Sequence, residues 1–136
     1  MELRATAVAG ATMSRILIVD EVDTAEDLAM LLGALGHETE MAFDVWQAID
    51  SFKSFRPDVV FLDLEMGFFD AFDAARAIRS GINGQHPFLV AVSATRGAEL
   101  EDATRAVGFD LCMKKPLDTS SVVAVANDFE QRRPAS

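Results

Sequence analysis

The feature that most constrains the fold is the alternation, five times over, of short strand-like runs with segments of helical periodicity. Three runs are continuous and rich in branched or aromatic side chains: Ile16-Leu17-Ile18-Val19, Val59-Val60-Phe61-Leu62 and Phe88-Leu89-Val90-Ala91-Val92. Such runs are typical of parallel strands that are covered on both faces. They predict three central strands.

Two weaker patterns complete the set of strands. Charged residues alternate with Thr39 and Met41 between Glu38 and Ala42, which predicts a strand with one wet face at an edge of the sheet. A fifth strand is predicted after Gly108, at Leu111-Cys112-Met113.

Five apolar stripes at helical spacing follow the five predicted strands. In the first stripe, Asp23 or Thr24 is available as an N-cap and Gly36 as the stop. The stripes are Leu28, Leu31, Leu32 and Leu35; Ala48, Ile49 and Phe52, ended by Pro57; Ala71, Ala75 and Ile78; Leu100, Ala103 and Val107; Val122, Ala126 and Phe129. Strand-then-helix units predict an α/β, doubly wound parallel sheet with helices on both faces.

The length of 136 residues, half of them hydrophobic, suits one domain. We expect this domain to span residues 14–132, between a flexible N-terminal tail at 1–13 and a C-terminal tail at 133–136. The apolar part of the first tail is too interrupted for a secretory signal. No apolar run approaches the ~20 residues that span a bilayer, so we expect no membrane partner.

Net charge and cysteine content limit the possible partners and the cellular compartment. With 12 basic and 22 acidic residues, the net charge of -10 argues against nucleic acid or an anionic membrane as the main partner, because either requires a basic face. The single cysteine, Cys112, excludes an internal disulfide and favours the cytoplasm.

Polar residues stand where the predicted central strands end. The first strand ends in Asp20-Glu21, the third in Asp63 and the fourth in Ser93, and the fifth runs into Lys114-Lys115-Pro116. The carboxyl ends of parallel strands share one edge, so we expect these side chains to converge. Clustered acids repel one another, a conflict that Mg²⁺ removes. Asp63 would then attack phosphorus to form an acyl phosphate, with a lysine and a serine hydroxyl on the phosphoryl oxygens.

Four motifs, ILIVDE, VVFLDLEM, VAVSA and KKP, resemble in order and interval the receiver domain of two-component response regulators. The resemblance implies a flavodoxin-like (βα)5 fold with strands in the order 2-1-3-4-5. It also implies transfer of a phosphoryl group from a sensor histidine kinase or phosphotransfer protein, dependent on Mg²⁺ or Mn²⁺, and signalling to a downstream protein target. Its switch surface lies around the fourth helix and fifth strand.

The resemblance assigns a role to each site residue. Asp63 is the phosphoacceptor, Ser93 the hydroxyl that moves to meet the phosphoryl group, and Lys115 the lysine that precedes a proline, often across a cis bond. The implied metal ligands are Asp20, Glu21, Asp63 and the backbone carbonyl of Glu65. We expect the Glu65 side chain to face solvent and tune water access, and Lys114 to point to the opposite side of its strand.

Four departures from the family pattern alter these expectations. Glu21 stands where aspartate is usual, so metal affinity should differ. No proline follows Met66 and Ala71 replaces a usual glycine, so the loop from Gly67 to Ala71 should be looser at its start and differently shaped at its end. Cys112 occupies the switch position, commonly aromatic in the family, so no aromatic rotamer flip can gate the switch.

Other conspicuous residues receive structural interpretations. Phe68 and Phe69 are expected to contact a partner or a second copy of the chain, because two adjacent side chains cannot easily bury in one direction. His37 is expected between the first helix and the edge strand, and Trp46 is expected to pack at a helix edge.

Two other functions stay open. A degenerate receiver that binds proteins independently of phosphorylation is favoured by Glu21, Gly67 and Cys112 together. Asp63-Leu64-Glu65 weakly resembles haloacid-dehalogenase-like phosphohydrolases, but these usually carry a second aspartate at the place of Glu65 and a cap domain. We expect self-phosphorylation and autodephosphorylation rather than multiple turnover. Because little follows Phe129, we also expect a stand-alone domain that acts by protein contact or as a phosphorelay carrier. A homodimer is a further expected assembly.

Overall fold

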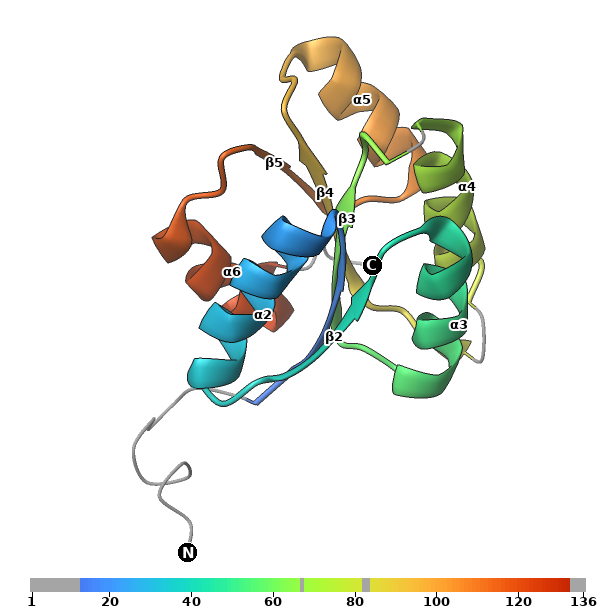
Figure 1. Cartoon of the computed structure of the whole chain (residues 1–136). Helices are drawn as coiled ribbons and strands as arrows, with labels where there is room; N and C mark the ends of the chain where they lie inside the picture. Colours follow the sequence, from blue (N-terminus) through green and yellow to red (C-terminus); the bar gives the residue numbers. More distant parts are fainter. Residues whose placement is uncertain (1–12, 67, 82–83, 133–136) are drawn as a thin grey trace, which may run out of the picture.

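The computed structural model describes residues 13–66, 68–81 and 84–132, and within them the chain forms an open parallel sheet with helices on both faces (Figure 1). The order of the five strands is β2-β1-β3-β4-β5, as predicted. The strands are β1 (Arg15–Val19), β2 (Glu38–Ala42), β3 (Val59–Asp63), β4 (Phe88–Ser93) and β5 (Leu111–Lys114).

Five helices cover the sheet in the described part of the chain. One face is covered by α2 (Val22–Ala34) and α6 (Thr119–Arg132), and the other by α3 (Val45–Phe55), α4 (Phe68–Arg79) and α5 (Ala98–Val107). No helix among the described residues has both the length and the apolar character needed to cross a bilayer.

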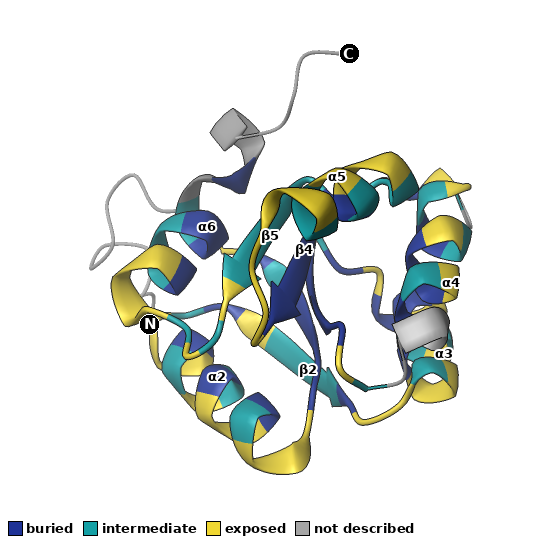
Figure 2. Ribbon diagram, turned by 90° about the horizontal axis from the view of Figure 1, so that it is seen from above, coloured by how far each residue is buried: buried dark blue, intermediate teal, exposed yellow. Residues whose placement is uncertain are grey.

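The core forms two layers because alternate side chains of a strand point to opposite faces. Ile16 and Ile18 of β1 pack under α2 and α6, whereas Leu17 and Val19 pack under α3 and α4. All residues of β3 and β4 are buried, and Figure 2 shows β4 dark throughout while β5 is only partly buried. Because both faces of these strands are buried, apolar and polar residues do not alternate along the central runs. The edge strand β2 keeps Glu38 exposed, as predicted.

Arg79, at the end of α4, forms hydrogen bonds with the segment that leads into β5. Its Nε donates to the Gly108 carbonyl oxygen at 2.9 Å, and its Nη2 lies 2.9 Å from Asp110 Oδ2. Asp110 Oδ2 also accepts from Leu89 N of β4. Gly108 ends α5 with φ at +118°, a conformation that side chains other than glycine rarely adopt.

Two helix predictions are corrected. Helix α2 begins at Val22, directly after the first strand, so its N-cap is Glu21 rather than Asp23 or Thr24. The Glu21 side chain makes no capping hydrogen bond. Leu35 lies past the helix end and is 40% exposed, because the chain turns away there before Gly36.

The stripe predicted for α5 is only partly buried. Leu100, Ala103 and Val107 are intermediate in exposure, while Thr104 is buried. The Thr104 hydroxyl donates to the Glu101 carbonyl oxygen at 2.9 Å, so its polar atom is satisfied within the helix. Helix α5 lies at the rim of the sheet with an exposed outer side (Figure 2), which leaves its apolar side chains incompletely covered.

The loop predicted from Gly67 to Ala71 is helical from Phe68 onward, and Ala71 is buried against the core. Gly67 and the side chains of Phe68 and Phe69 lie outside the described part, so the contact patch stays a prediction. The same holds for the tails, of which residues 1–12 and 133–136 are not described.

Trp46 does not pack at a helix edge as predicted. It is 79% exposed, because it lies in the first turn of α3 on the side away from the buried stripe of Ala48 and Phe52. His37 lies between α2 and β2 in the chain and is buried. Its Nδ1 accepts from Ser14 N at 3.0 Å, and its Nε2 lies 3.0 Å from Asn127 Oδ1 of α6.

Candidate functional site

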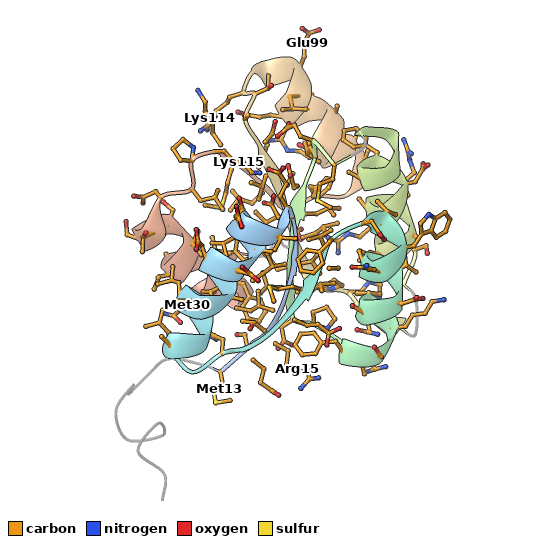
Figure 3. The ribbon with its side chains drawn as sticks, in the orientation of Figure 1. Met13, Arg15, Met30, Glu99, Lys114 and Lys115 are labelled. Atoms are coloured by element: carbon orange, nitrogen blue, oxygen red, sulfur yellow. The ribbon has the colours of Figure 1, made fainter. Side chains whose placement is uncertain are left out.

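The polar residues predicted to converge do meet beyond the carboxyl ends of the central strands. Asp20 follows β1, Asp63 ends β3, Ser93 ends β4 and Lys115 follows β5. Figure 3 shows Lys115 directed toward these strand ends and Lys114 directed outward, in agreement with the exposure of Lys114. The Lys115-Pro116 bond is cis.

One ammonium group bridges two buried carboxylates. Lys115 Nζ lies 3.0 Å from Asp20 Oδ1 and 3.2 Å from Asp63 Oδ2, and both aspartates are only 2% exposed. Backbone amides complete the pairing: Glu21 N donates to Asp20 Oδ1 at 2.7 Å, and Glu65 N donates to Asp63 Oδ1 at 3.0 Å. These contacts orient the Asp63 carboxylate.

The electrostatics of the site favour an additional positive charge. Burial raises the pKa of Asp63, and the neighbouring Asp20 raises it further, against the lowering by the Glu65 amide and Lys115. Burial alone would lower the pKa of Lys115, but the hydrogen bond to Asp20 and the charges of both aspartates raise it overall. Lys115 is therefore fully charged near neutral pH, and it is shared between two anions.

Asp63 and Lys115 open onto a cavity of about 580 Å³ at this edge of the sheet. The cavity is lined by Glu21, Phe43, Asp63, Glu65, Met66, Ala94 and Lys115. A group the size of a phosphoryl can reach Asp63 from this side.

The acidic residues fit a hard cation only in part. No three acidic, histidine or cysteine side chains gather into a metal-binding group anywhere in the described part of the chain. Asp20 and Asp63 lie together, whereas Glu21 is exposed and reaches only the cavity lining. Mg²⁺ often takes just one or two carboxylates and keeps several waters, so the chemistry of the aspartate pair suits it.

The Glu65 side chain has a role that the sequence did not predict. Ser93 Oγ donates to Glu65 Oε2 at 2.7 Å, and Ala94 N donates to Glu65 Oε1 at 2.9 Å. Glu65 is exposed as expected, but its carboxylate is bound to the end of β4 rather than free in solvent. Strand pairing of Asp63 with Val92 brings the two segments together, a register that no local pattern reveals.

Cys112 lies on β5 opposite Ala91 and packs partly buried against the core layer under α3, α4 and α5. Burial raises the pKa of its thiol, and the charge of Glu101 adds to the effect. A neutral, small thiol therefore fills the predicted switch position.

A model of the response regulator receiver domain matches residues 16–127 of the chain. Among curated proteins, the DNA-binding response regulator MtrA of Mycobacterium leprae is 36% identical over 67 residues. This stretch is 48% of the chain, and it spans only 30% of the length of MtrA.

Solved structures share the fold over nearly the whole chain. The chemotaxis response regulator CheY4 of Vibrio cholerae superposes with a TM-score of 0.77 at 21% identity, covering 89% of this chain and 99% of CheY4. A two-component response regulator from Clostridium difficile superposes with a TM-score of 0.79 at 21% identity, covering 88% and 98%.

Proposed function

The chain belongs to the response regulator receiver domain family, and from this membership we propose that it accepts a phosphoryl group on Asp63 and signals through protein contacts. The family is a signalling module of two-component systems rather than a classical enzyme. The observation that carries the proposal is the Lys115 ammonium shared between Asp20 and Asp63 at the cavity.

In the proposed reaction, a carboxylate oxygen of Asp63 attacks the phosphorus of a phosphohistidine. The new O–P bond replaces the N–P bond, and the histidine leaves as neutral imidazole because its other ring nitrogen already carries a proton. Glu65 N holds Asp63 Oδ1, so Oδ2, which faces Lys115, is the oxygen available for attack. Lys115 lies where it can neutralise the negative charge that gathers on the phosphoryl oxygens.

We propose that Asp20, Glu21, Asp63 and the backbone carbonyl of Glu65 hold Mg²⁺ or Mn²⁺. When bound, the ion supplies positive charge to the phosphoryl oxygens and reduces repulsion between the acids. The buried aspartate pair with one shared lysine supports this assignment. Glu21, which lines the cavity, is the third side-chain ligand in this proposal.

The proposed partners are a sensor histidine kinase or phosphotransfer protein and a downstream protein target, with a homodimer as a further assembly. MtrA is named as a DNA-binding protein, but the match covers 30% of its length. The net charge of -10 supports contact with proteins rather than nucleic acid or anionic membrane. We propose a cytoplasmic location and no multiple-turnover activity.

The second candidate is a receiver that binds its partner independently of phosphorylation. It is favoured by one observation: the Glu65 carboxylate accepts hydrogen bonds from the Ser93 hydroxyl and the Ala94 amide. Equal affinity of the Asp63→Asn variant and the wild-type protein for a partner would support this candidate.

The test of the main proposal is intact mass after incubation with Mg²⁺ and acetyl phosphate, a small phosphodonor. We expect the wild-type protein to gain one phosphoryl group, Asp63→Asn to gain none, and a chelator to suppress the gain. An unmodified wild-type mass under these conditions, or a gain that persists in Asp63→Asn, would contradict the proposal.

A further inference from the structure

The Glu65 carboxylate uses both of its oxygens to bind two different donors at the end of β4. The distances, 2.7 Å from Ser93 Oγ and 2.9 Å from Ala94 N, are those of charge-assisted hydrogen bonds. The Ser93 hydroxyl is 1% exposed, and its oxygen also accepts from Thr95 N at 3.0 Å. The hydroxyl is thus fixed on both sides.

Each of these donors has a single hydrogen to give. A serine hydroxyl has one proton and a backbone amide has one, and in the structure both go to Glu65. Ala94 and Glu65 also line the cavity that contains Asp63 and Lys115. The resemblance to receiver domains assigns Ser93 to the phosphoryl oxygens of a modified Asp63. If an oxyanion there takes these two donors, Glu65 must release them, because each donor has one hydrogen.

We propose that the Glu65 carboxylate is a resident ligand of Ser93 and Ala94 that a phosphoryl group on Asp63 must displace. This inference rests on the proposed function. It adds that the Glu65 carboxylate competes with the phosphoryl group for the same hydrogen-bond donors. Glu65 is a positioning residue. Its carboxylate holds the Ser93 hydroxyl and the Ala94 amide in place, and a phosphoryl group can bind these donors only after the carboxylate has left.

Displacement is feasible for two physical reasons. The phosphoryl group carries more negative charge than the carboxylate, so repulsion between them drives Glu65 away once Asp63 is modified. Glu65 is also exposed, so its released carboxylate passes into water rather than into the core. The contact therefore lowers the affinity of the site for a phosphoryl group without abolishing it.

The probe is beryllofluoride, a tetrahedral fluoride complex that mimics a phosphoryl group on aspartate, titrated at fixed Mg²⁺ and followed by fluorine NMR. We expect Glu65→Ala to lower the apparent Kd about tenfold, because the donors become free in every molecule. The matched control is Glu99→Ala, which removes the same charge from an exposed position at the outer tip of α5 (Figure 3) and should leave the Kd unchanged.

Glu65→Gln separates competition for hydrogen bonds from repulsion of charge. Glutamine loses the charge but keeps one acceptor oxygen, so it should retain part of the competition and bind the probe with intermediate affinity. Equal gains for the Gln and Ala variants would assign the effect to charge alone and overturn the proposal.

A second measurement follows hydrogen exchange at one backbone amide instead of the affinity for the probe. In the metal-free protein, Glu65→Ala should speed hydrogen exchange of the Ala94 amide, which loses its acceptor, and beryllofluoride with Mg²⁺ should restore protection. Unchanged exchange at Ala94, or equal Kd values for wild type and Glu65→Ala, would refute the resident ligand while leaving phosphorylation of Asp63 intact. Failure of both proteins to bind the probe would instead refute the proposed function.

Discussion

The Lys115 ammonium lies 3.2 Å from Asp63 Oδ2, and the lysine side chain is only 21% exposed. The same nitrogen contacts Asp20, so this pocket holds two buried anions and one cation. Removing the cation of such a set leaves two buried carboxylates without compensation, which destabilises the fold more than losing a surface ion pair. The site should therefore be visible in folding experiments as well as in phosphorylation.

Lys115→Ala should destabilise the metal-free protein by about 2 kcal/mol, somewhat less than is typical of fully buried pairs because Lys115 is partly exposed. Urea denaturation measures the change. Lys114→Ala is the matched control, since Lys114 is exposed and should alter stability by less than about 0.5 kcal/mol. Added Mg²⁺ should narrow the gap between Lys115→Ala and wild type; an unchanged gap would argue against a cation beside the aspartates.

Asp63→Asn should stabilise the metal-free protein at neutral pH. Burial and Asp20 hold the pKa of Asp63 above its ordinary value, so the folded state binds this proton more tightly than the unfolded state. Stability from this group is greatest below the unfolded pKa and declines as pH rises through the window up to the folded pKa. The variant should thus have a Tm a few degrees higher at pH 7 and no advantage below the ordinary aspartate pKa. A lower Tm at pH 7 would contradict this.

Gly108→Ala should cost about 2 kcal/mol of stability. Its φ of +118° disfavours a side chain, and an added Cβ would lie 2.8 Å from Arg79 Cγ, which the Arg79 hydrogen bonds hold in place. Gly33→Ala is the contrasting variant. It lies inside α2 with nothing within 4 Å of the added carbon and should stabilise by about 0.5–1 kcal/mol. If urea denaturation gave the same change in stability for Gly108→Ala and Gly33→Ala, this prediction would be wrong.

Trp46, the single tryptophan, should fluoresce as a water-exposed indole. Its 79% exposure predicts emission at the long-wavelength end of the protein range, ready quenching by acrylamide and little shift on unfolding. A blue-shifted, protected emission from the native protein would show that Trp46 is covered in solution. Far-ultraviolet circular dichroism should follow unfolding more sensitively than this fluorescence.

The central strands and the main site residues could be predicted because burial on both faces leaves a strong local signature. Continuous, branched or aromatic runs such as Val59 to Leu62 are typical of covered strands, and strands that run parallel place their carboxyl ends at one edge. Asp20, Asp63 and Lys115 meet for that reason.

The features that the sequence did not predict depend on three-dimensional packing, which a short stretch of sequence does not reveal. Trp46 lies in α3, but on the side away from the buried stripe of Ala48 and Phe52, so it is exposed. Thr104 can be buried because its hydroxyl donates to the Glu101 carbonyl oxygen within α5. The composition of the sequence does not reveal this hydrogen bond. The Glu65 contact with Ser93 follows from the pairing of β3 with β4 and the path of the chain beyond Asp63.

The cation of the pocket comes from the end of β5, an outermost strand that pairs with β4 over only four residue pairs. A nascent chain that has emerged as far as Ser93 already contains both aspartates and the hydroxyl, yet lacks the lysine that makes their proximity tolerable. The phosphoryl chemistry that we propose therefore requires β5 to be docked on the sheet, because only then does Lys115 reach the two aspartates.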